Sequence, residues 1–193
     1  MKAQAFPVGK YQLKMAALVM SDPAMYSAVE LLRDGQHVEI RALRLDDRAN
    51  LLAAVGRTSS QSLYRRFFAV KRGFTEQEIA FFSNVDFVSH VALVAVMEEG
   101  GQPFIVGGGR YIIMQPGQAE VAFVVVDQYQ GHGIGAKLLH HLAVIARDAG
   151  LKELVAEILP DNTSMLKVFE RSGLPVGTKR GPQGVHITLQ LSA

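Results

Sequence analysis

A glycine-rich loop between an expected strand and an expected helix constrains the fold of this chain more than any other feature. The stretch VVVDQYQGHGIGAKLL, residues 124–139, places a valine run before Gly131, Gly133 and Gly135 and a leucine pair after them. Valine favours strands, and glycine lets a backbone turn tightly or approach a ligand closely. A strand, a glycine loop and a helix N-terminus in this order indicate a site for phosphate groups.

The loop that binds nucleoside triphosphates, G-x-x-x-x-G-K-[ST], fits this stretch incompletely. Counted from Gly131, the pattern brings Lys137 into place. Ala136, however, stands where the second glycine belongs, and Leu138 stands where a hydroxyl should ligate magnesium. Two failures at functional positions exclude this class of site.

A dinucleotide-binding fingerprint fits better and stays an alternative. Gly131, Gly133 and Ala136 match G-x-G-x-x-[GA], and Glu157 ends the next expected strand where an acid could bind a ribose. Against this class, DQYQ separates the valine strand from the first glycine, whereas the fingerprint glycine follows its strand almost directly. The strand, glycine loop and helix also lie late in the chain, which leaves no room after them for the repeated βαβ units of a doubly wound sheet.

The remaining sequence predicts a mixed α/β domain around a central, mostly antiparallel sheet. Asp34-Gly35 is typical of a hairpin turn, and Thr75 and Glu78 have the spacing of a capping box at a helix start. The expected elements are a hairpin within 28–43, helices from Asp46 or Asp47 to about Val55, at 62–68 and at 75–82, strands at 91–97, 104–114 and 119–126, a helix at 134–149, a strand at 153–159, a helix at 162–172 and a strand at 185–191.

The helix expected at 134–149 has the clearest periodicity. One face carries the apolar residues Ile134, Leu138, Leu142, Ile145 and Ala149, and Gly150 ends the helix. This face predicts a helix that packs against the sheet. Residues 27–193 are interpreted as one domain and residues 1–26 as an N-terminal extension lying on it.

Composition excludes several classes of partner and chemistry. The net charge of +2 forms no basic stripe, so we expect no nucleic acid. The absence of cysteine excludes disulfides, thiolate-bound zinc and a cysteine nucleophile, and it fits a cytoplasmic protein. The apolar run at 15–20 is far shorter than the roughly 20 residues that span a bilayer, so we expect no membrane partner. His140 and His141, adjacent on a helix, are interpreted as surface or boundary residues, and no metal site is expected.

A third pattern, Q-x-x-G-x-G, is met by Gln130, Gly133 and Gly135. With it the chain resembles the GCN5-related N-acetyltransferase (GNAT) superfamily, whose members bind acyl-CoA. The resemblance covers about residues 36–191, and it includes NTSMLKVFERSGL at 162–174, which is similar to the family's second CoA-side motif. It implies a single GNAT-like domain in which helices flank the sheet and splayed strands hold CoA.

The resemblance also implies which residues bind acetyl-CoA as the cosubstrate. Gln130 through Ala136 would wrap the pyrophosphate, the backbone of Val124 and Val126 would pair with the pantetheine amides, and Asn162 would contact or order the pantetheine arm. The cofactor-binding residues implied in this way are Val124, Val125, Val126, Gln130, Gly131, His132, Gly133, Ile134, Gly135, Ala136, Asn162, Met165 and Phe169.

Acetyl transfer to an amine requires a neutral nitrogen. Freeing the lone pair of a lysine with a pKa of about 10.4 costs roughly 4 to 5 kcal/mol at pH 7, which makes a general base worth having. Glu120 opens an apolar strand and shares a face with Ala122, Val124 and Val126, and in the family an acid at this point acts as the base. A family tyrosine that often protonates the leaving thiolate is replaced here by Phe169, and Tyr111 is only a weak substitute.

A narrower resemblance concerns the acceptor. VEIRALRLDD, SLYRRFF and DFVSHVALVAV look like parts of the catalytic domain of bacterial Pat-type protein lysine acetyltransferases. This implies a protein lysine as acceptor, for example on an acyl-CoA synthetase, with Tyr64, Arg65, Arg66 and Phe67 beside the acceptor groove. A small-molecule amine as acceptor and a non-catalytic acyl-CoA sensor remain alternatives. The resemblance leaves a monomer and a dimer both open.

Overall fold

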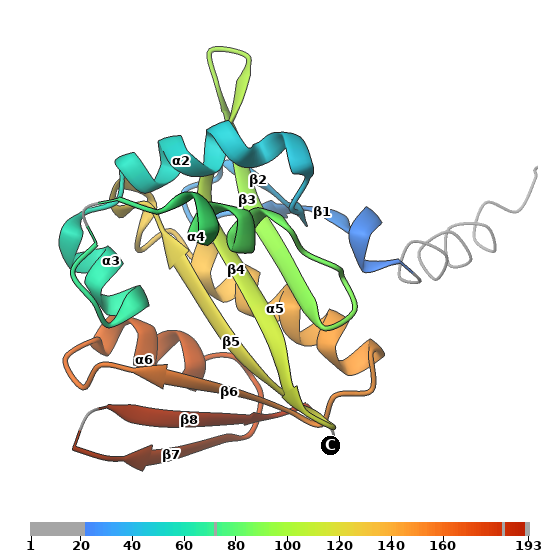
Figure 1. Cartoon of the computed structure of the whole chain (residues 1–193), viewed down its shortest axis with the longest axis vertical. Helices are drawn as coiled ribbons and strands as arrows, with labels where there is room; N and C mark the ends of the chain where they lie inside the picture. Colours follow the sequence, from blue (N-terminus) through green and yellow to red (C-terminus); the bar gives the residue numbers. More distant parts are fainter. Residues whose placement is uncertain (1–21, 72, 183, 192–193) are drawn as a thin grey trace, which may run out of the picture.

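The computed structural model describes residues 22–71, 73–182 and 184–191. Within them, the strands form one eight-stranded sheet in the order β1-β2-β3-β4-β5-β6-β8-β7 (Figure 1). The strands are β1 Ser27–Leu31, β2 His37–Ala42, β3 His90–Glu99, β4 Gln102–Gln115, β5 Gln118–Val125, β6 Glu153–Ile158, β7 Val176–Arg180 and β8 Val185–Gln190. Each neighbouring pair is antiparallel except β5 and β6, which confirms the expected mostly antiparallel sheet.

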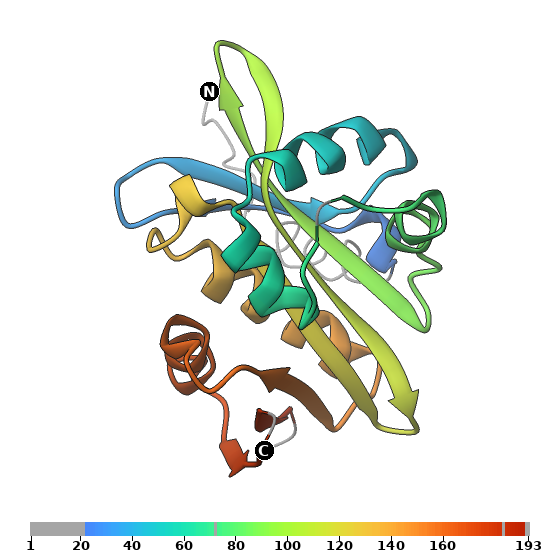
Figure 2. The ribbon, with the colours of Figure 1, turned by 60° about the vertical axis from the view of Figure 1, so that its left-hand side comes forward.

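Helices cover both faces of this sheet (Figure 2). They are α2 Arg48–Gly56, α3 Ser60–Phe67, α4 Glu76–Ser83, α5 Ile134–Asp148 and α6 Thr163–Glu170, with 3₁₀ turns η1 Pro23–Met25, η2 Leu45–Asp47 and η3 Asp127–Tyr129. The capping box of Thr75 and Glu78 is confirmed at the start of α4. None of the helices among the described residues has the length and apolar character needed to cross a membrane.

Residues 1–21 of the expected extension lie outside the described residues, and residues 22–26 contain η1, which leads into β1. Two details of the chain differ from the sequence-based expectations. Strand β7 was not predicted, because this exposed edge strand pairs only with β8 and lacks an alternating apolar pattern. Ala149 does not belong to the buried face of α5, since the helix ends at Asp148 and Ala149 is an exposed C-cap.

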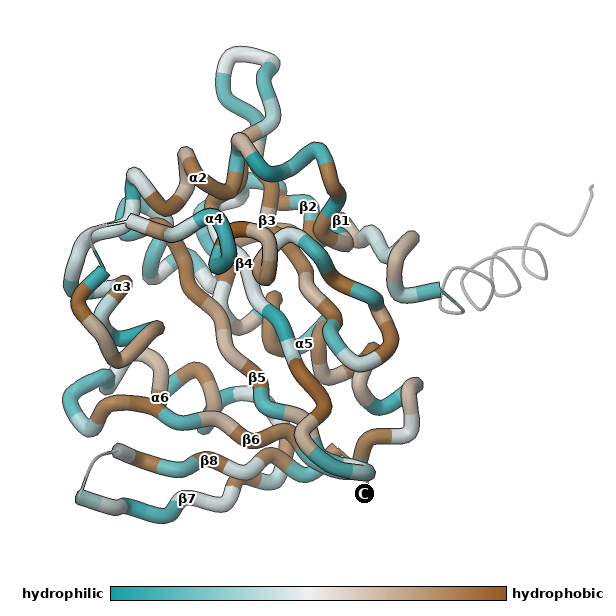
Figure 3. Tube along the Cα trace, in the orientation of Figure 1, coloured by the Kyte–Doolittle hydropathy of each residue, from teal (hydrophilic) through white to brown (hydrophobic). Residues whose placement is uncertain are grey.

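Side chains of β3 point alternately to two cores. Val91, Leu93 and Ala95 pack in a core that includes α5, whereas Ala92 and Val94 pack toward α2 with Leu43. Figure 3 shows the corresponding pattern, with hydrophobic colour along the central strands and polar colour at the tip of the β3–β4 hairpin. A strand buried on both faces reads as a continuous apolar run, which is why VALVAV lacks alternation.

Helix α5 approaches β4 closely because β4 carries glycine where the two meet. A Cβ placed on Gly109 would lie 3.0 Å from Leu142 Cδ1 and 3.1 Å from Phe123 Cβ. Leu142 itself is fully buried. The position of α5, and therefore of the loop before it, depends on this contact.

A buried ion pair holds the chain between β2 and α2. Arg41 donates two hydrogen bonds of 2.7 Å to Asp47, and the Arg44 N–H donates a third at 2.8 Å. Asp47 was expected to cap the following helix, but its side chain makes no cap bond to α2 and turns back to Arg41 instead. Burial by itself would raise the pKa of Asp47, but the hydrogen bonds from Arg41 and Arg44 outweigh it and lower the pKa.

Replacing Leu142 by alanine tests the packing of α5. We expect Leu142→Ala to lower the free energy of unfolding by about 3 kcal/mol, because a cavity would remain over Gly109. Urea denaturation measures the change. Leu45→Ala is the matched control, since Leu45 is 80% exposed and its truncation should change stability by no more than about 0.5 kcal/mol. Equal losses in the two variants would contradict the packing described here.

Replacing Asp47 by asparagine tests the buried ion pair. We expect Asp47→Asn to cost about 3 kcal/mol at pH 7, because it leaves the Arg41 guanidinium buried without its countercharge. The folded-state pKa of Asp47 lies below the ordinary 3.8, so its contribution is present above pH 3.8 and is lost as the pH falls below that value.

Urea denaturation of the wild type and of Asp47→Asn at several pH values measures this dependence. The difference between the two proteins should shrink in acid. The exposed neighbour serves as control, and Asp46→Asn should leave stability nearly unchanged at every pH. A difference between wild type and Asp47→Asn that is independent of pH would contradict the assignment.

Candidate active site

The site is built where β5 separates from β6. The two parallel strands pair only along Gln118–Glu120 and Glu153–Val155, and beyond Glu120 they diverge (Figure 1). On its other side β5 stays paired with β4 as far as Val125 and Gly107. The expected splayed strands are confirmed, and the β5 edge after Glu120 carries backbone groups without a neighbouring strand.

A cleft of about 540 Å³ lies at this divergence. We call it the β5–β6 cleft. Strand β5, the glycine loop, the first turn of α5, helix α6 and part of α3 line it. Of the cofactor-binding residues expected from sequence, those that line the cleft are Val124, Val125, Gln130, Gly131, Gly133, Ile134, Gly135, Ala136, Asn162, Met165 and Phe169.

Val126 and the backbone register depart from the expectation. The Val126 N–H donates to the Val106 carbonyl on β4 at 2.9 Å, so it does not face the cleft. Because backbone groups alternate along a strand, Val124 also points its groups toward β4, and those of Phe123 and Val125 point toward the cleft. The backbone groups of Val124 and Val126 therefore do not face the cleft, as the expected pairing with the pantetheine amides would require. The Val126 side chain lies in a separate inner cavity instead.

The glycine loop places unpaired N–H groups toward the cleft. Gly131 and Gly133 adopt left-handed conformations with φ of 83° and 99°, which residues with a Cβ adopt at a cost. Gly133 is the N-cap of α5 and no side chain caps that helix end. The first N–H groups of α5 have no intrahelical acceptor, so they and the helix dipole favour an anion at this end of the cleft.

The side chain of Gln130 ties the loop to its neighbours. Its Nε2 donates to the Val125 carbonyl at 3.0 Å and to Ser62 Oγ of α3 at 3.1 Å. Asp127 fixes the same helix, because it accepts hydrogen bonds from the Ser59 N–H, the Ser59 hydroxyl and the Ser62 hydroxyl at 2.7, 2.7 and 2.9 Å. The start of α3 is thereby held against the end of β5.

The positive charge at the loop comes from a residue that sequence reasoning missed. His132 does not line the cleft, since its ring contacts the Gln130 carbonyl at 2.9 Å and Asp34 at 3.5 Å. Arg33, in the β1–β2 turn, lines the cleft beside Gly133 instead. No local signal in the sequence brings that turn to the glycine loop. Five basic side chains line the cleft against the two carboxylates Glu120 and Glu157, namely Arg33, Arg65, Arg66, Lys167 and Arg171.

Helix α6 forms the opposite wall. Asn162 is buried and caps this helix, accepting a hydrogen bond from the Met165 N–H at 3.3 Å. Phe169 is buried and packs against Phe123 with 5.6 Å between ring centroids. The expected tyrosine substitute, Tyr111, is absent from the residues that line the cleft, and burial raises its pKa to about 12. Neither Phe169 nor Tyr111 can therefore donate a proton there.

Glu120 faces the cleft from the last paired position of β5. Its side chain shares a face with Ala122 and Val124, as the alternation predicted. Arg66 of α3 lines the same cleft. Burial lowers the pKa of Arg66, and the charge of Glu120 partly offsets this effect, so the two side chains lie within electrostatic reach. No ion pair joins them among the described residues.

The residues expected beside the acceptor are only partly brought together. Arg65, Arg66 and Phe67 line the cleft, and Arg65 also pairs with Asp161 at 3.4 Å. Tyr64 does not line it and is 42% exposed. One turn of α3 therefore contributes three of the four predicted residues.

His141 is buried, not a surface or boundary residue as expected. It lies on α5, where Glu30 lies 2.9 Å from Nε2 and the Tyr26 hydroxyl lies 2.5 Å from Nδ1. Lys137 donates to the same Glu30 at 2.6 Å. His140 is exposed. Among the described residues, no three His, Cys, Asp or Glu side chains gather in a way that could hold a metal ion.

Comparisons with known proteins place this architecture in a family. A family model described as "Acetyltransferase (GNAT) family" matches residues 52–174. Acetyltransferase Pat of Mycolicibacterium smegmatis is 34% identical over 144 residues, which are 74% of this chain and 42% of the relative. Acetyltransferase PA5475 of Pseudomonas aeruginosa is 33% identical over 138 residues, which are 71% of this chain and 74% of the relative.

A solved structure agrees with these relatives. The crystal structure of the GNAT domain of S. lividans PAT superimposes with a TM-score of 0.79 at 34% identity, covering 87% of this chain and 98% of that one. The chain spans less than half the length of the mycobacterial Pat. Since the family model covers more than half of the sequence and these relatives are 34% and 33% identical over 74% and 71% of this chain, the chain belongs to the acetyltransferase (GNAT) family.

Proposed function

We propose that this chain transfers an acetyl group from acetyl-CoA to the amine of a protein lysine, with Glu120 as the general base. The observation that carries the proposal is the position of Glu120. It stands where β5 leaves β6, in the same cleft as the free strand edge and the glycine loop. A carboxylate at that point lies beside any group that pairs with the strand edge.

The cleft fits the parts of acetyl-CoA one by one. The amides of a pantetheine arm can pair with the backbone of Phe123 and with the N–H of Val125, whose carbonyl already accepts from Gln130, in the way that an added strand does. The pyrophosphate matches the unpaired N–H groups at the start of α5. Arg33 supplies at the loop the positive charge that His132, turned toward Asp34, does not direct into the cleft.

Acetyl transfer requires a thioester, a base and a neutral amine. Bound acetyl-CoA supplies an acyl thioester. Glu120 accepts the proton of the acceptor ammonium, directly or through a water, so that the nitrogen lone pair can attack the thioester carbon in a ternary complex. The chain has no cysteine that could carry an acetyl group between substrates. The CoA thiolate leaves without a tyrosine acid, which a thiol pKa of about 8.5 permits.

A protein lysine is the preferred acceptor because of the likeness to Pat-type enzymes. An acyl-CoA synthetase is the first substrate to test. Arg65, Arg66 and Phe67 of α3 line the same cleft as Glu120, so an acceptor side chain bound against α3 would lie near this carboxylate.

Two glycine variants test whether the loop binds acetyl-CoA. Gly131 and Gly150 have left-handed φ of 83° and 79°, and a Cβ at either position would meet no atom within 4 Å. Alanine at either site should therefore cost a similar 1–2 kcal/mol of stability. Isothermal titration should show acetyl-CoA binding at least tenfold weaker in Gly131→Ala and unchanged in Gly150→Ala. Equal acetyl-CoA affinities in both variants would remove the loop from the binding site.

Replacing Glu120 by glutamine tests the general base. We expect Glu120→Gln to bind acetyl-CoA as the wild type does and to lose at least 100-fold in turnover, because the amide cannot accept a proton. Acetyl-CoA affinity and steady CoA release with an acceptor measure the two effects. Glu99→Gln, at the exposed end of β3, is the control and should keep full activity. Near-normal turnover of Glu120→Gln would rule out this role.

The acceptor class can be identified with a lysate of the source organism. Pure protein and acetyl-CoA are added, and new acetyl-lysine sites are mapped by mass spectrometry beside the Glu120→Gln variant. Sites that depend on Glu120 would identify a protein lysine acceptor. CoA release with small amines, but no Glu120-dependent protein sites, would move the acceptor to small molecules.

A further inference from the structure

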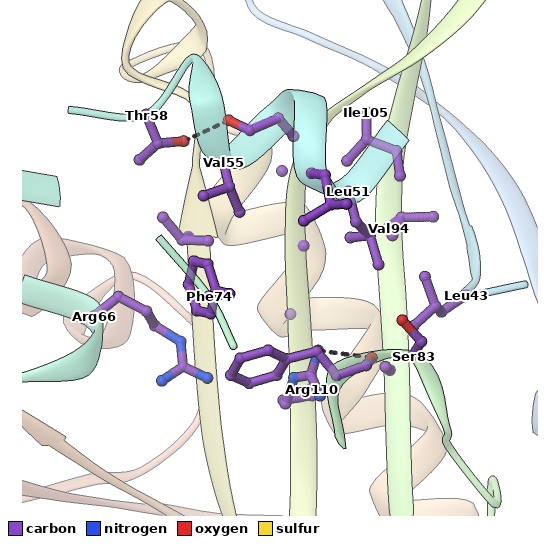
Figure 4. Close-up of a pocket in the computed structure, with 18 of the residues that line it drawn as sticks. Leu43, Leu51, Val55, Thr58, Arg66, Phe74, Ser83, Val94, Ile105 and Arg110 are labelled. Atoms are coloured by element: carbon purple, nitrogen blue, oxygen red, sulfur yellow. Dashed lines mark hydrogen bonds between the residues drawn. The ribbon is translucent and has the colours of Figure 1, made fainter. Parts of the chain in front are cut away.

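A second cavity lies on the inner side of the cleft. This inner chamber, of about 110 Å³, is lined by residues of α2, α3 and α4 and of β3, β4 and β5 (Figure 4). Gly108 in its wall has no side chain to fill it, and a Cβ there would meet only the Leu93 carbonyl oxygen, at 3.6 Å. This volume is large enough to hold a short side chain.

Most of the chamber wall is apolar, from residues such as Leu51, Val55 and Phe74. Three arginines interrupt this lining. Arg48 pairs with Glu76 at 2.6 Å, whereas Arg66 and Arg110 lie at the same end of the chamber in Figure 4. Ser83 also lines it, and its hydroxyl is buried without a hydrogen-bond partner. Buried polar groups without partners are costly, so this end of the chamber is matched to a polar ligand.

Arg110 is held in place by its surroundings. Its guanidinium contacts His90 Nε2 at 2.9 Å, donates to the Phe82 carbonyl at 3.3 Å and lies 4.6 Å from the centre of the Phe82 ring. Burial and the charge of Arg110 lower the pKa of His90, while Asp86 acts against them. A neutral His90 can accept a hydrogen bond from Arg110, which leaves further N–H groups of Arg110 for a ligand.

Arg66 enters the chamber from α3. Its guanidinium lies 4.9 Å from the centre of the Phe67 ring, and no hydrogen bond or ion pair to it is found within the described ranges. Burial and, to a smaller extent, the charge of Arg66 lower the pKa of Arg110 to about 9. The Arg66 and Arg110 guanidiniums are thus both removed from water near each other. The carboxylate whose charge raises the pKa of Arg66 is Glu120, in the adjoining cleft.

The chamber and the cleft share a wall. Arg66, Phe67, Ala122 and Val124 line both cavities, and Glu120 lies two residues before Ala122 on the same face of β5. A group bound by the two arginines would therefore lie next to an amine positioned at Glu120. An acyl tail in the chamber would leave the Arg66 guanidinium and the Ser83 hydroxyl without partners among the described residues, so an anionic ligand fits better.

We infer that the acceptor carries a carboxylate near its reacting amine and that Arg66 and Arg110 bind this carboxylate. The inference rests on the proposed acetyl transfer at Glu120, because it names the acceptor for that site. On a protein the carboxylate is the side chain of an Asp or Glu beside the target lysine, and on a free amino acid it is the α-carboxylate. Guanidinium groups bind carboxylates with strong, directional hydrogen bonds.

Binding of two labelled peptides tests the inference without requiring turnover. Each has one lysine, flanked by glycine in the first and by aspartate in the second, and CoA is present so that no reaction occurs. Fluorescence anisotropy should show the aspartate peptide binding at least tenfold more tightly, with a preference that decreases as salt rises. Equal affinities for the two peptides, or no binding of either at millimolar concentration, would overturn the inference.

Variants assign the preference to the two arginines. Arg66→Gln and Arg110→Gln should each abolish most of it, whereas Arg66→Lys, which keeps the charge, should retain part of it. Arg57→Gln is the control, because Arg57 lines neither cavity. Thermal melting identifies any variant that fails to fold. If the glutamine variants do not fold, the preference measured with Arg66→Lys decides whether the inference holds. An undiminished preference in all folded variants would contradict the role of the arginines.

Turnover separates this inference from the proposed function. CoA release is measured with the two peptides and with free amino acids. Selective binding of the aspartate peptide without any CoA release would sink the proposed acetyl transfer while supporting the carboxylate site. Arg66-dependent acetylation of free amino acids alone would support the site and reassign the acceptor from proteins to small molecules. Equal turnover of the glycine and aspartate peptides would overturn the carboxylate site alone.

Discussion

The divergence of β5 from β6 after Glu120 is the constraint on which the rest of the site depends. Pairing with β4 continues as far as Val125, so the backbone groups of β5 keep their alternation along the edge that faces away from β4. The α5 helix begins at the end of that edge, and its position is set by the close contact of Leu142 with Gly109. A ligand that follows the edge therefore runs from the unpaired helix N-terminus to the carboxylate of Glu120.

Charge in this protein is distributed to suit anions at two points. Basic side chains outnumber carboxylates at the cleft, where phosphates are proposed to bind. Three arginines, Arg48, Arg66 and Arg110, line the inner chamber, and no carboxylate lies in the part of its wall that the structure describes. Glu120 lies between these two regions. Such an arrangement costs stability in the free protein, because Arg66 and Arg110 are desolvated near each other. Sites that bind ligands often carry such costs, which the bound partner then relieves.

Local patterns predicted much of the fold, and their failures have local physical causes. The periodicity of α5, the capping box at Thr75 and the Asp34-Gly35 hairpin depend on neighbouring residues, so they could be predicted from a short window. Asp47 was misinterpreted because its ion-pair partner, Arg41, lies in another element. His141 was misinterpreted because Tyr26 and Glu30, more than a hundred residues away in sequence, enclose it. The place of Arg33 at the glycine loop was not predicted for the same reason, because about a hundred residues separate the two in sequence.

The sequence by itself determined the order of the elements, the glycine loop with its following helix, and the acid on the face of β5. These follow from residue type and spacing within one strand, loop or helix. Only the tertiary structure decided which backbone groups face the cleft, since the bond from Val126 to Val106 sets the register of β5 against β4. It also brought Arg33 to the loop and Arg66 to Arg110, because packing of separate elements places charges that no spacing along the chain relates.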